Sequence, residues 1–540
     1  MDKFIRWWNQ KGARCGEKRY VTLGKAVLAS LLPLACVLTY CAAQGRSLGE
    51  VYLPASQWND ELFYFKQVEG IVNYGFPQGY FGFNESHALK LSFAAWSPVL
   101  VFPWILWGLL FGWNLMSPVW CNLLLLSLCC FVYVCLVRPS WKQLGILAFL
   151  FCLYTPFVRY LLSGMPEVIC FCMVIGFYSL AVSYVRAERV WKLALLFGMS
   201  GVMTLMRPYL LMFMLLPAFF WIRREKCGGW KGLLGSAAVM GVVLGLYAWV
   251  KHYLGAEYFT PLFFTDWITS FPERGFFGGI GYTVSRLYYM GKAFLGHLLQ
   301  GMRTGLASGA IFGSYLVCAG ILAIHCARDW MAYRRRKKDG QSGGKDLPAI
   351  EIHLAFCFVA MLFALLLMYK LTEGSKHLLT FLAAAVFVVP LMDTRFYKKA
   401  VLLGAVFAWF FSYKAVDPYD YQVPFVEEAR EASLEKWREA LRGELVLERE
   451  HVPGYENVVI WTFEDRVEGE NVMTSWQLLY ALPEGFGISC CMRDYVAENF
   501  EGLQSRYLAC PTGGEIQGMC REAGYSLVYG DGELALYRLR

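Results

Sequence analysis

The sequence predicts a polytopic α-helical membrane protein with a small α/β domain after its last membrane-spanning segment. Of its 540 residues, 57% are hydrophobic and only 17% are charged, whereas soluble proteins carry about a quarter charged residues. The apolar residues gather in runs of about twenty, a length that crosses a ~30 Å hydrocarbon core. The net charge of +8 lies mostly in short loops, which indicates membrane topology rather than a nucleic-acid partner.

The chain begins with a basic tail, residues 1–22, followed by a first apolar run at 23–43 that we interpret as a retained helix. Basic clusters recur between the later apolar runs. They are Arg138/Lys142, Arg186/Arg189/Lys192, Arg223/Arg224/Lys226/Lys231, residues 334–338 and Arg395/Lys398/Lys399. The positive-inside rule places all of them in the cytoplasm with the N-terminus. The number of crossings between successive clusters must therefore return the chain to the cytoplasmic side each time.

This requirement decides three ambiguous segments. Residues 91–113 are apolar enough to span, but Pro98 and Pro103 interrupt them and a crossing there would move every later cluster outside. We therefore expect a broken juxtamembrane segment. Residues 193–222 should form two short crossings that turn at Arg207-Pro208, and residues 276–303 should form an external amphipathic segment.

The prediction is thus about eleven transmembrane helices in a domain at 23–415, with the N-terminus inside and the C-terminus outside. The expected crossings are 23–43, 117–137, 143–160, 167–185, two within 193–222, 232–251, 305–326, 351–370, 378–392 and 400–414. Two long external loops follow from this topology, at 44–116 and 252–304.

Residues 416–540 are polar enough to form a separate extracytoplasmic domain. We expect helices at 426–445 and 514–525, strands at 457–463 and 505–510, and a hairpin around Asp531-Gly532. Its cysteines are Cys490, Cys491, Cys510 and Cys520. Both disulfides and buried free thiols are compatible with the sequence, and four cysteines allow three full pairings.

The first external loop carries ionisable residues near the membrane surface, namely Asp60, Glu61, Glu85 and His87. Two interpretations of the adjacent Asp60 and Glu61 stay open. They can stabilise the start of a helix, because acids there satisfy free N–H groups and the helix dipole. Alternatively, one of them takes a proton from an acceptor hydroxyl, or both hold a divalent cation such as Mg²⁺ or Mn²⁺.

At this point the sequence resembles the GT-C glycosyltransferases, such as protein O-mannosyltransferases and the aminoarabinose transferases of lipid A. One helix followed by a long external loop with an acidic pair is typical of them, and 62–75 and 91–113 resemble their two juxtamembrane helices. Further similar segments are "FVRYLLSGMPE" at 157–167, "MRPYLLMFMLLP" at 206–217 and "GSKHLLTFLAAAVFVVP" at 374–390. In the last segment Lys376-His377 stands where the family has Arg-Tyr.

The resemblance implies an inverting hexosyl- or pentosyltransferase that uses a polyprenyl-phosphate-linked donor. The acceptor would be a hydroxyl or amine on an envelope glycan, lipid or protein, and the reaction would occur on the outer face of a bacterial-type plasma membrane. Asp60 would be the base and Glu61 its partner or a metal ligand. Candidates for binding the donor phosphate are Arg159, Arg207, Arg274, Lys376 and His377.

Glu167, at the end of the 157–167 segment, is a further candidate, and several of the candidates also have a structural explanation. Arg159 and Lys376 can place their charges at helix ends, and Glu167 can serve as an acid at a helix N-terminus.

A transporter or flippase of lipid-linked sugars is the alternative function, as is a polymerase or ligase. Transporters place charges near the membrane midplane, whereas here the charges gather at external helix ends.

Overall fold

The structure is a computed structural model of the chain. It describes residues 19–56, 58–77, 82–85, 93, 97–224, 229–255, 263–304, 307–338, 349–369, 371–391, 423–442, 444, 455–483 and 486–540. Most of the predicted basic tail at 1–22, the predicted crossing at 400–414 and His87 lie outside these residues.

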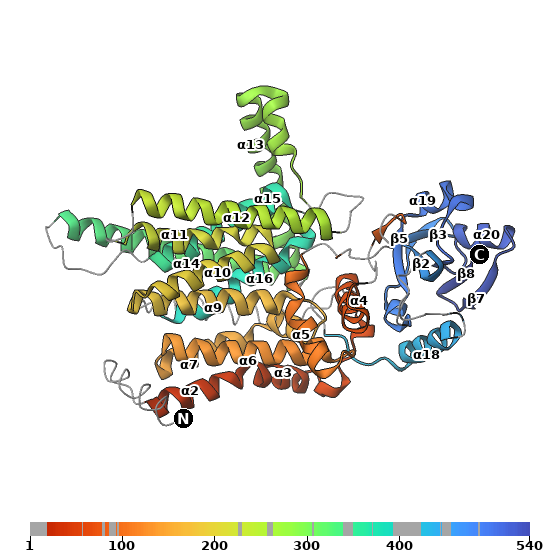
Figure 1. The fold of residues 1–540 in the computed structure, drawn as a ribbon, viewed down its shortest axis with the longest axis horizontal. Helices are drawn as coiled ribbons and strands as arrows, with labels where there is room; N and C mark the ends of the chain where they lie inside the picture. The colour runs from red at the N-terminus through yellow and green to blue at the C-terminus, as the bar shows by residue number, and fades with distance from the viewer. Residues whose placement is uncertain are drawn as a thin grey trace.

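Apolar helices form an elongated bundle, with the C-terminal domain at one end (Figure 1). They are α2 (Arg19–Ser30), α3 (Leu32–Ala43), α6 (Ser117–Val137), α7 (Trp141–Leu153), α8 (Thr155–Leu161), α9 (Glu167–Arg186), α10 (Val190–Met206), α11 (Leu215–Ile222), α12 (Trp230–Leu254), α14 (Ala307–Lys338), α15 (Ala349–Met368) and α16 (Leu371–Val388). Local signals set several of these ends. Ser140 and Gln143, for example, form a reciprocal capping box at the start of α7.

The predicted count of about eleven crossings is only partly reproduced. In the described part of the chain, seven helical segments are long and apolar enough to span a membrane, or eight if the bent pair α7–α8 counts as one. That pair bends by 73°. The segments Val190–Met206 and Pro208–Ile222 are shorter than the rest. The break between them falls at Arg207, as predicted, because Pro208 cannot donate a backbone hydrogen bond to a continuing helix.

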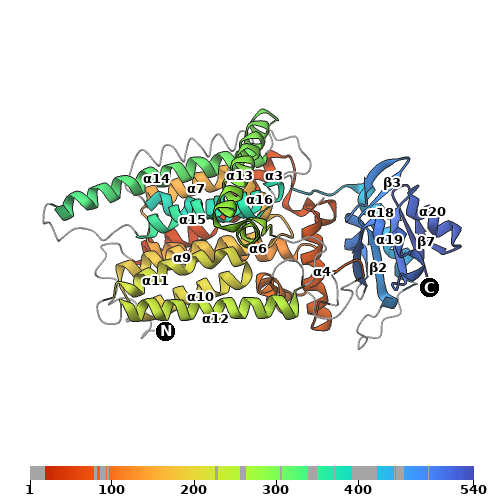
Figure 2. The same cartoon turned by 90° about the horizontal axis from the view of Figure 1, so that it is seen from above.

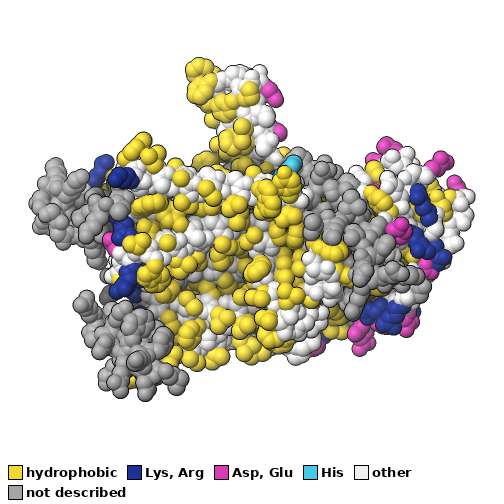
Figure 3. Space-filling model, in the orientation of Figure 1, with side chains coloured by type: hydrophobic (Ala, Val, Ile, Leu, Met, Phe, Trp, Pro, Cys, Tyr) yellow, Lys and Arg dark blue, Asp and Glu magenta, His cyan; other side chains and the backbone are white. Residues whose placement is uncertain are grey.

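Two helices lie inside the bundle and others lie at its surface. In the most apolar part of α16, 83% of the residues are buried, and in that of α9, 67% are buried. In the corresponding part of α12, only 11% of the residues are buried. Helix α9 packs against α6, α10 and α16. Hydrophobic side chains cover the outer face of the bundle (Figure 3), as expected for a surface that contacts lipid rather than water.

The basic loops gather at the end of the bundle farther from the C-terminal domain (Figures 1 and 3). Lys25 donates to Pro139 O at 3.0 Å, and Arg186 donates to Val137 O at 2.5 Å. Lys192 donates to Ser183 O at 2.6 Å. These contacts join the start of α2 with the loops that follow α6 and α9. The basic clusters that the structure describes therefore lie at one end, as predicted, whereas Arg395, Lys398 and Lys399 lie outside the described residues.

The first loop contains two of the elements expected from the sequence. Helix α4 (Asn59–Tyr74) ends at Gly75, whose φ of 79° suits a glycine after a helix. Helix α5 (Phe102–Phe111) begins beside Pro103 and has ten residues, too few to cross a bilayer. In the second loop, α13 (Asp266–Thr304) kinks at Gly275 and stands out sideways from the bundle in Figure 1.

The C-terminal domain has the predicted α/β composition. Its strands are β2 (Val458–Thr462), β3 (Glu464–Val467), β4 (Glu470–Met473), β5 (Gly487–Cys491), β6 (Tyr507–Pro511), β7 (Ser526–Gly530) and β8 (Leu534–Arg538), and its helices are α18 (Glu428–Arg442), α19 (Arg493–Glu498) and α20 (Glu515–Glu522). In β2, Trp461 packs toward Trp437 of α18, and Ile460 packs on the other face with Ile516 of α20. Both faces of the sheet are thus covered, which explains why β2 is apolar throughout.

The four cysteines of this domain are buried free thiols. Burial raises their pKa values, to about 12 for Cys491 and Cys520. Of the two alternatives that the sequence left open, the structure shows free thiols.

A strand of the first loop completes the C-terminal sheet. The order is β1-β5-β2-β6-β8-β7, and β1 (Gly82–Phe83) pairs in parallel with β5. Glu85 follows β1 and is buried, where its carboxylate accepts from the amides of Gln504 and Ser505 at 2.7 to 3.1 Å. The first loop and the C-terminal domain therefore lie at the same end of the molecule, as both Figure 1 and Figure 2 show.

Candidate active site

The acidic pair lies in the first turn of α4. The helix begins after Trp58, whose side chain makes no capping hydrogen bond. Asp60 and Glu61 retain the favourable position for an acid near the positive end of a helix dipole. Each carboxylate nevertheless binds a cationic side chain from a distant part of the chain, so helix stabilisation alone does not describe them.

Asp60 binds Lys376 of α16. Lys376 Nζ donates to Asp60 Oδ2 at 2.5 Å across 316 residues of sequence. The Asp60 side chain is 37% exposed and that of Lys376 is 18% exposed. Of the acidic pair, Asp60 is thus the residue that a bound molecule can reach.

Glu61 is fully buried and binds Arg159 of α8. Arg159 Nη1 donates to Glu61 Oε1 at 2.9 Å, and Arg159 Nη2 donates to Ser56 Oγ at 3.3 Å. The guanidinium also lies 3.7 Å from the centroid of the Trp58 ring, a close cation–π contact. Burial raises the pKa of the Glu61 carboxyl, while the charge of Arg159 opposes that rise. This arrangement fixes α8 against the start of α4.

A second buried cluster surrounds Arg207. Its guanidinium forms an ion pair with Glu167 Oε1, and its Nη1 lies 3.1 Å from Tyr209 Oη and 2.9 Å from His377 Nδ1. Because a guanidinium can only donate, Nδ1 of His377 is an acceptor. Arg207, Glu167 and His377 are each at most 1% exposed. Since His377 follows Lys376 on α16, this cluster adjoins the Asp60 pair.

The charged residues of both clusters come from helix ends. Glu167 begins α9, Arg207 follows the last residue of α10, and Lys376 and His377 lie in the first two turns of α16. These termini lie at the end of the bundle that faces the C-terminal domain (Figure 1). The charges thus gather at helix ends on one side of the bundle, and their position at an outer membrane surface stays a prediction.

Three sequence candidates lie elsewhere or cannot be placed. Arg274 is exposed on α13, and its guanidinium lies 4.9 Å from the centroid of Tyr282 on the same helix. Glu85 joins the first loop to the C-terminal domain, as described above. His87 lies outside the described residues.

The donor set does not fit a divalent cation well. Among the residues that the structure describes, no group of three or more His, Cys, Asp or Glu side chains is arranged to hold a metal ion. Asp60 and Glu61 each bind a cationic side chain instead of sharing a site. Mg²⁺ or Mn²⁺ binding at this pair stays a prediction.

Sequence reasoning missed the aromatic members of the site. Trp58 flanks the acidic pair, and Tyr209 lies two residues after Arg207, so both could have been suspected from proximity alone. Tyr480 of the C-terminal domain had no such signal. It is buried, and burial together with the charge of Glu61 raises the pKa of its hydroxyl.

No family model matches the chain, and no curated protein matches it. A search of solved structures finds similarity to ArnT from Cupriavidus metallidurans, in a crystal structure with bound undecaprenyl phosphate. The TM-score is 0.42, and the sequences are 12% identical over 95% of this chain and 98% of that chain.

Proposed function

We propose that this chain is a membrane glycosyltransferase that moves a sugar from a polyprenyl-phosphate-linked donor to a hydroxyl or amine acceptor. The observation that supports this most is the Asp60–Lys376 pair beside the Arg207 cluster. It combines an accessible carboxylate, which can act as a base, with cationic side chains at helix ends that face the C-terminal domain. Those two components match the needs of a reaction that deprotonates an acceptor and releases a phosphate.

In the proposed reaction, Asp60 accepts the proton of the acceptor hydroxyl or amine. The acceptor atom forms a bond to the anomeric carbon of the donor sugar. The bond from that carbon to the phosphate oxygen breaks, and its electron pair leaves with the polyprenyl phosphate. Attack opposite the leaving group inverts the anomeric configuration. Lys376 has three N–H donors, so it can hold Asp60 and a donor phosphate oxygen together.

The buried residues act by positioning in this proposal. Glu61 holds Arg159 against α4, and Glu167 and His377 hold Arg207 beside Lys376. Because each arginine is paired with a buried carboxylate, the two clusters hold Lys376 and Asp60 in place rather than adding net charge. We further propose that the site lies on the extracytoplasmic face of a bacterial-type plasma membrane and that the acceptor belongs to the cell envelope.

The test is a transfer assay with purified full-length protein and radiolabelled polyprenyl-phosphate sugars. Asp60→Asn should reduce transfer by about a hundredfold or more, since general-base catalysis contributes about 10² to 10⁴. Asp266→Asn is the matched control, because Asp266 is an exposed acid that pairs with Arg286 at 3.9 Å on α13. It should transfer at the wild-type rate.

Wild-type rates in Asp60→Asn would contradict the role of Asp60. If the wild-type protein transfers no sugar but moves the labelled lipid across proteoliposome membranes, the function is transport rather than glycosyl transfer.

A further inference from the structure

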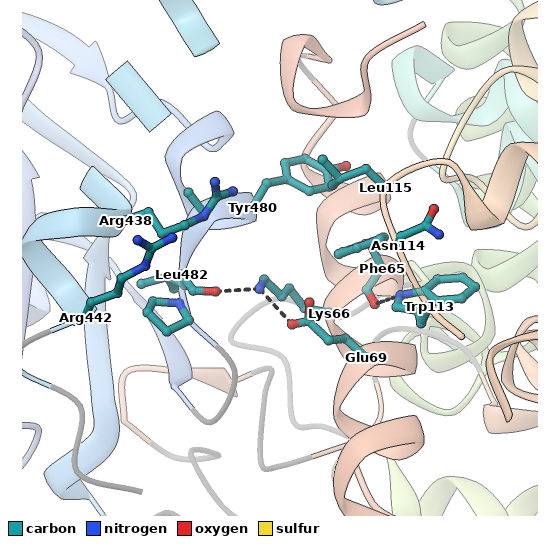
Figure 4. Close-up of a pocket in the computed structure, with 12 residues that line it drawn as sticks. Phe65, Lys66, Glu69, Trp113, Asn114, Leu115, Arg438, Arg442, Tyr480 and Leu482 are labelled. Carbon is teal, nitrogen blue, oxygen red and sulfur yellow. Dashed lines mark hydrogen bonds and ion pairs between the residues drawn. The ribbon is translucent and has the colours of Figure 1, made fainter. Parts of the chain in front are cut away.

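A pocket lies where the first loop meets the C-terminal domain (Figure 4). Its volume is about 310 Å³, at the lower limit of the range for small-molecule sites. Four parts of the chain line it: α4, the segment that joins α5 to α6, α18, and the segment 480–483. The lining residues are Phe65, Lys66, Glu69, Trp113, Asn114, Leu115, Arg438, Arg442, Tyr480, Ala481, Leu482 and Pro483.

One side of the pocket is aromatic and held in place. Phe65 and Trp113 stack with ring centroids 5.5 Å apart and planes at 30°, and Tyr480 lies 5.6 Å from Phe65. Trp113 Nε1 also donates to Phe65 O at 3.0 Å. An ordered aromatic surface of this kind suits the apolar C–H face of a sugar ring, which stacks on aromatic rings while its hydroxyls point outward.

The opposite side of the pocket is cationic. Arg438 and Arg442 lie one turn apart on α18, so their side chains share a face of the helix. Glu435 binds both, at 2.6 Å and 3.6 Å. Because a guanidinium has five N–H donors, each arginine retains donors that can bind a carboxylate or phosphate. Figure 4 shows both arginines across the pocket from Trp113.

A lysine fixes the base of the pocket and joins its two sides. Lys66 Nζ donates to Glu69 Oε2 and to Leu482 O, both at 2.7 Å. The side chain is 6% exposed. Lys66 thus ties α4 to the C-terminal domain, and the pocket depends on their contact.

The pocket lies along α4, about one turn beyond the acidic pair. Phe65 follows Glu61 by four residues on α4, so the two share a face of the helix and differ by a rise of about 6 Å. Tyr480 lines the pocket, and burial together with the charge of Glu61 raises the pKa of its hydroxyl.

We propose that this pocket binds the acceptor and selects an anionic saccharide, in which a sugar carries a carboxylate or a phosphate group. The sugar ring stacks on Trp113, and its anionic group binds Arg438 and Arg442. The inference rests on the proposed transferase function for its biological meaning, but binding itself requires no donor. It can therefore be tested separately.

The first experiment measures binding by calorimetry to the full-length protein in detergent, without donor. The probes are trigalacturonic acid, phosphorylated maltotriose and unmodified maltotriose. At least one anionic probe should bind, and maltotriose should bind at least tenfold more weakly. Binding to the variant Arg438→Gln/Arg442→Gln should weaken about tenfold or more, because charge-assisted hydrogen bonds are lost. Arg430→Gln is the control, since Arg430 also lies on α18 but pairs with Glu533.

Several outcomes overturn the inference: no binding of either anionic probe, equal binding of maltotriose, or unchanged binding by the double variant. The two anionic probes distinguish a carboxylated from a phosphorylated acceptor. In a transfer assay, the double variant should raise the acceptor KM at least fivefold with little change in kcat. If probes bind as expected but no sugar is transferred, the proposed function fails and the pocket assignment stands.

Discussion

Asp60 and Glu61 are neighbours in the sequence but occupy different environments. Asp60 is partly exposed and binds a lysine, whereas Glu61 is fully buried and binds an arginine. The difference follows from helix geometry, because consecutive residues on a helix point about 100° apart. One carboxylate can therefore meet a substrate while the other secures the scaffold. Substitution of Asp60 should therefore reduce mainly the activity, whereas substitution of Glu61 should reduce mainly the stability.

At this scale we predict strong coupling between Glu61 and Arg159. Glu61→Met or Arg159→Met alone should destabilise the protein by roughly 3 kcal/mol, because each leaves a buried charge without its partner. The double variant should be less destabilised than the sum of the two single variants. Thermal unfolding in detergent would measure all four proteins. Strictly additive effects would show that the pair is not coupled.

At the scale of elements, the first loop acts as a connector between the bundle and the C-terminal domain. Strand β1 adds to the edge of the C-terminal sheet, and α4 carries the acidic pair at its start and pocket residues farther along. The C-terminal domain thus helps to position α4. A substitution at this contact should lower the activity of the site, even though the substituted residue does not contact the site.

Glu85→Gln tests this contact. Glu85 accepts from two backbone amides of the C-terminal domain, and an amide side chain binds them more weakly than a carboxylate. We expect a loss of about 2 kcal/mol of stability and faster proteolysis between the two parts, with lower transfer activity. The control is Glu533→Gln, in an exposed pair that should contribute under about 1 kcal/mol. Equal proteolysis of both variants would rule out a connecting role for Glu85.

At the scale of the whole molecule, the two ends of the helical bundle carry different kinds of residues and different parts of the fold. The basic loops lie at one end of the bundle, and the acidic pair, the Arg207 cluster and the C-terminal domain lie at the other. With the positive-inside rule, this polarity predicts an extracytoplasmic C-terminal domain.

Cysteine labelling in intact bacterial cells can test that orientation. Glu470→Cys places a thiol on the exposed strand β4, and Glu188→Cys places one in the exposed loop between α9 and α10. A membrane-impermeant maleimide should label the first variant in intact cells and the second only after permeabilisation. The reverse pattern would invert the topology. Labelling of both variants in intact cells would show that β4 and the α9–α10 loop do not lie on opposite sides of the membrane.

Patterns within single segments predicted much of the fold. The lengths of the apolar runs indicated most of the crossings, Pro208 indicated the break after α10, and the Asp-Gly turn indicated the hairpin of β7 and β8. The predicted count of about eleven is reproduced only in part, because Val190–Met206 and Pro208–Ile222 are shorter than a span and the crossing expected at 400–414 lies outside the described residues.

The sequence by itself therefore determined the membrane class, the polarity of charge and the residue types available for chemistry. These properties depend on local apolar length and on charge in nearby loops. Only the tertiary structure decided which partners meet: Asp60 with Lys376 across 316 residues, or Phe65 with Arg438 around one pocket. Such contacts depend on how helices and domains pack against one another, and no local periodicity encodes that arrangement.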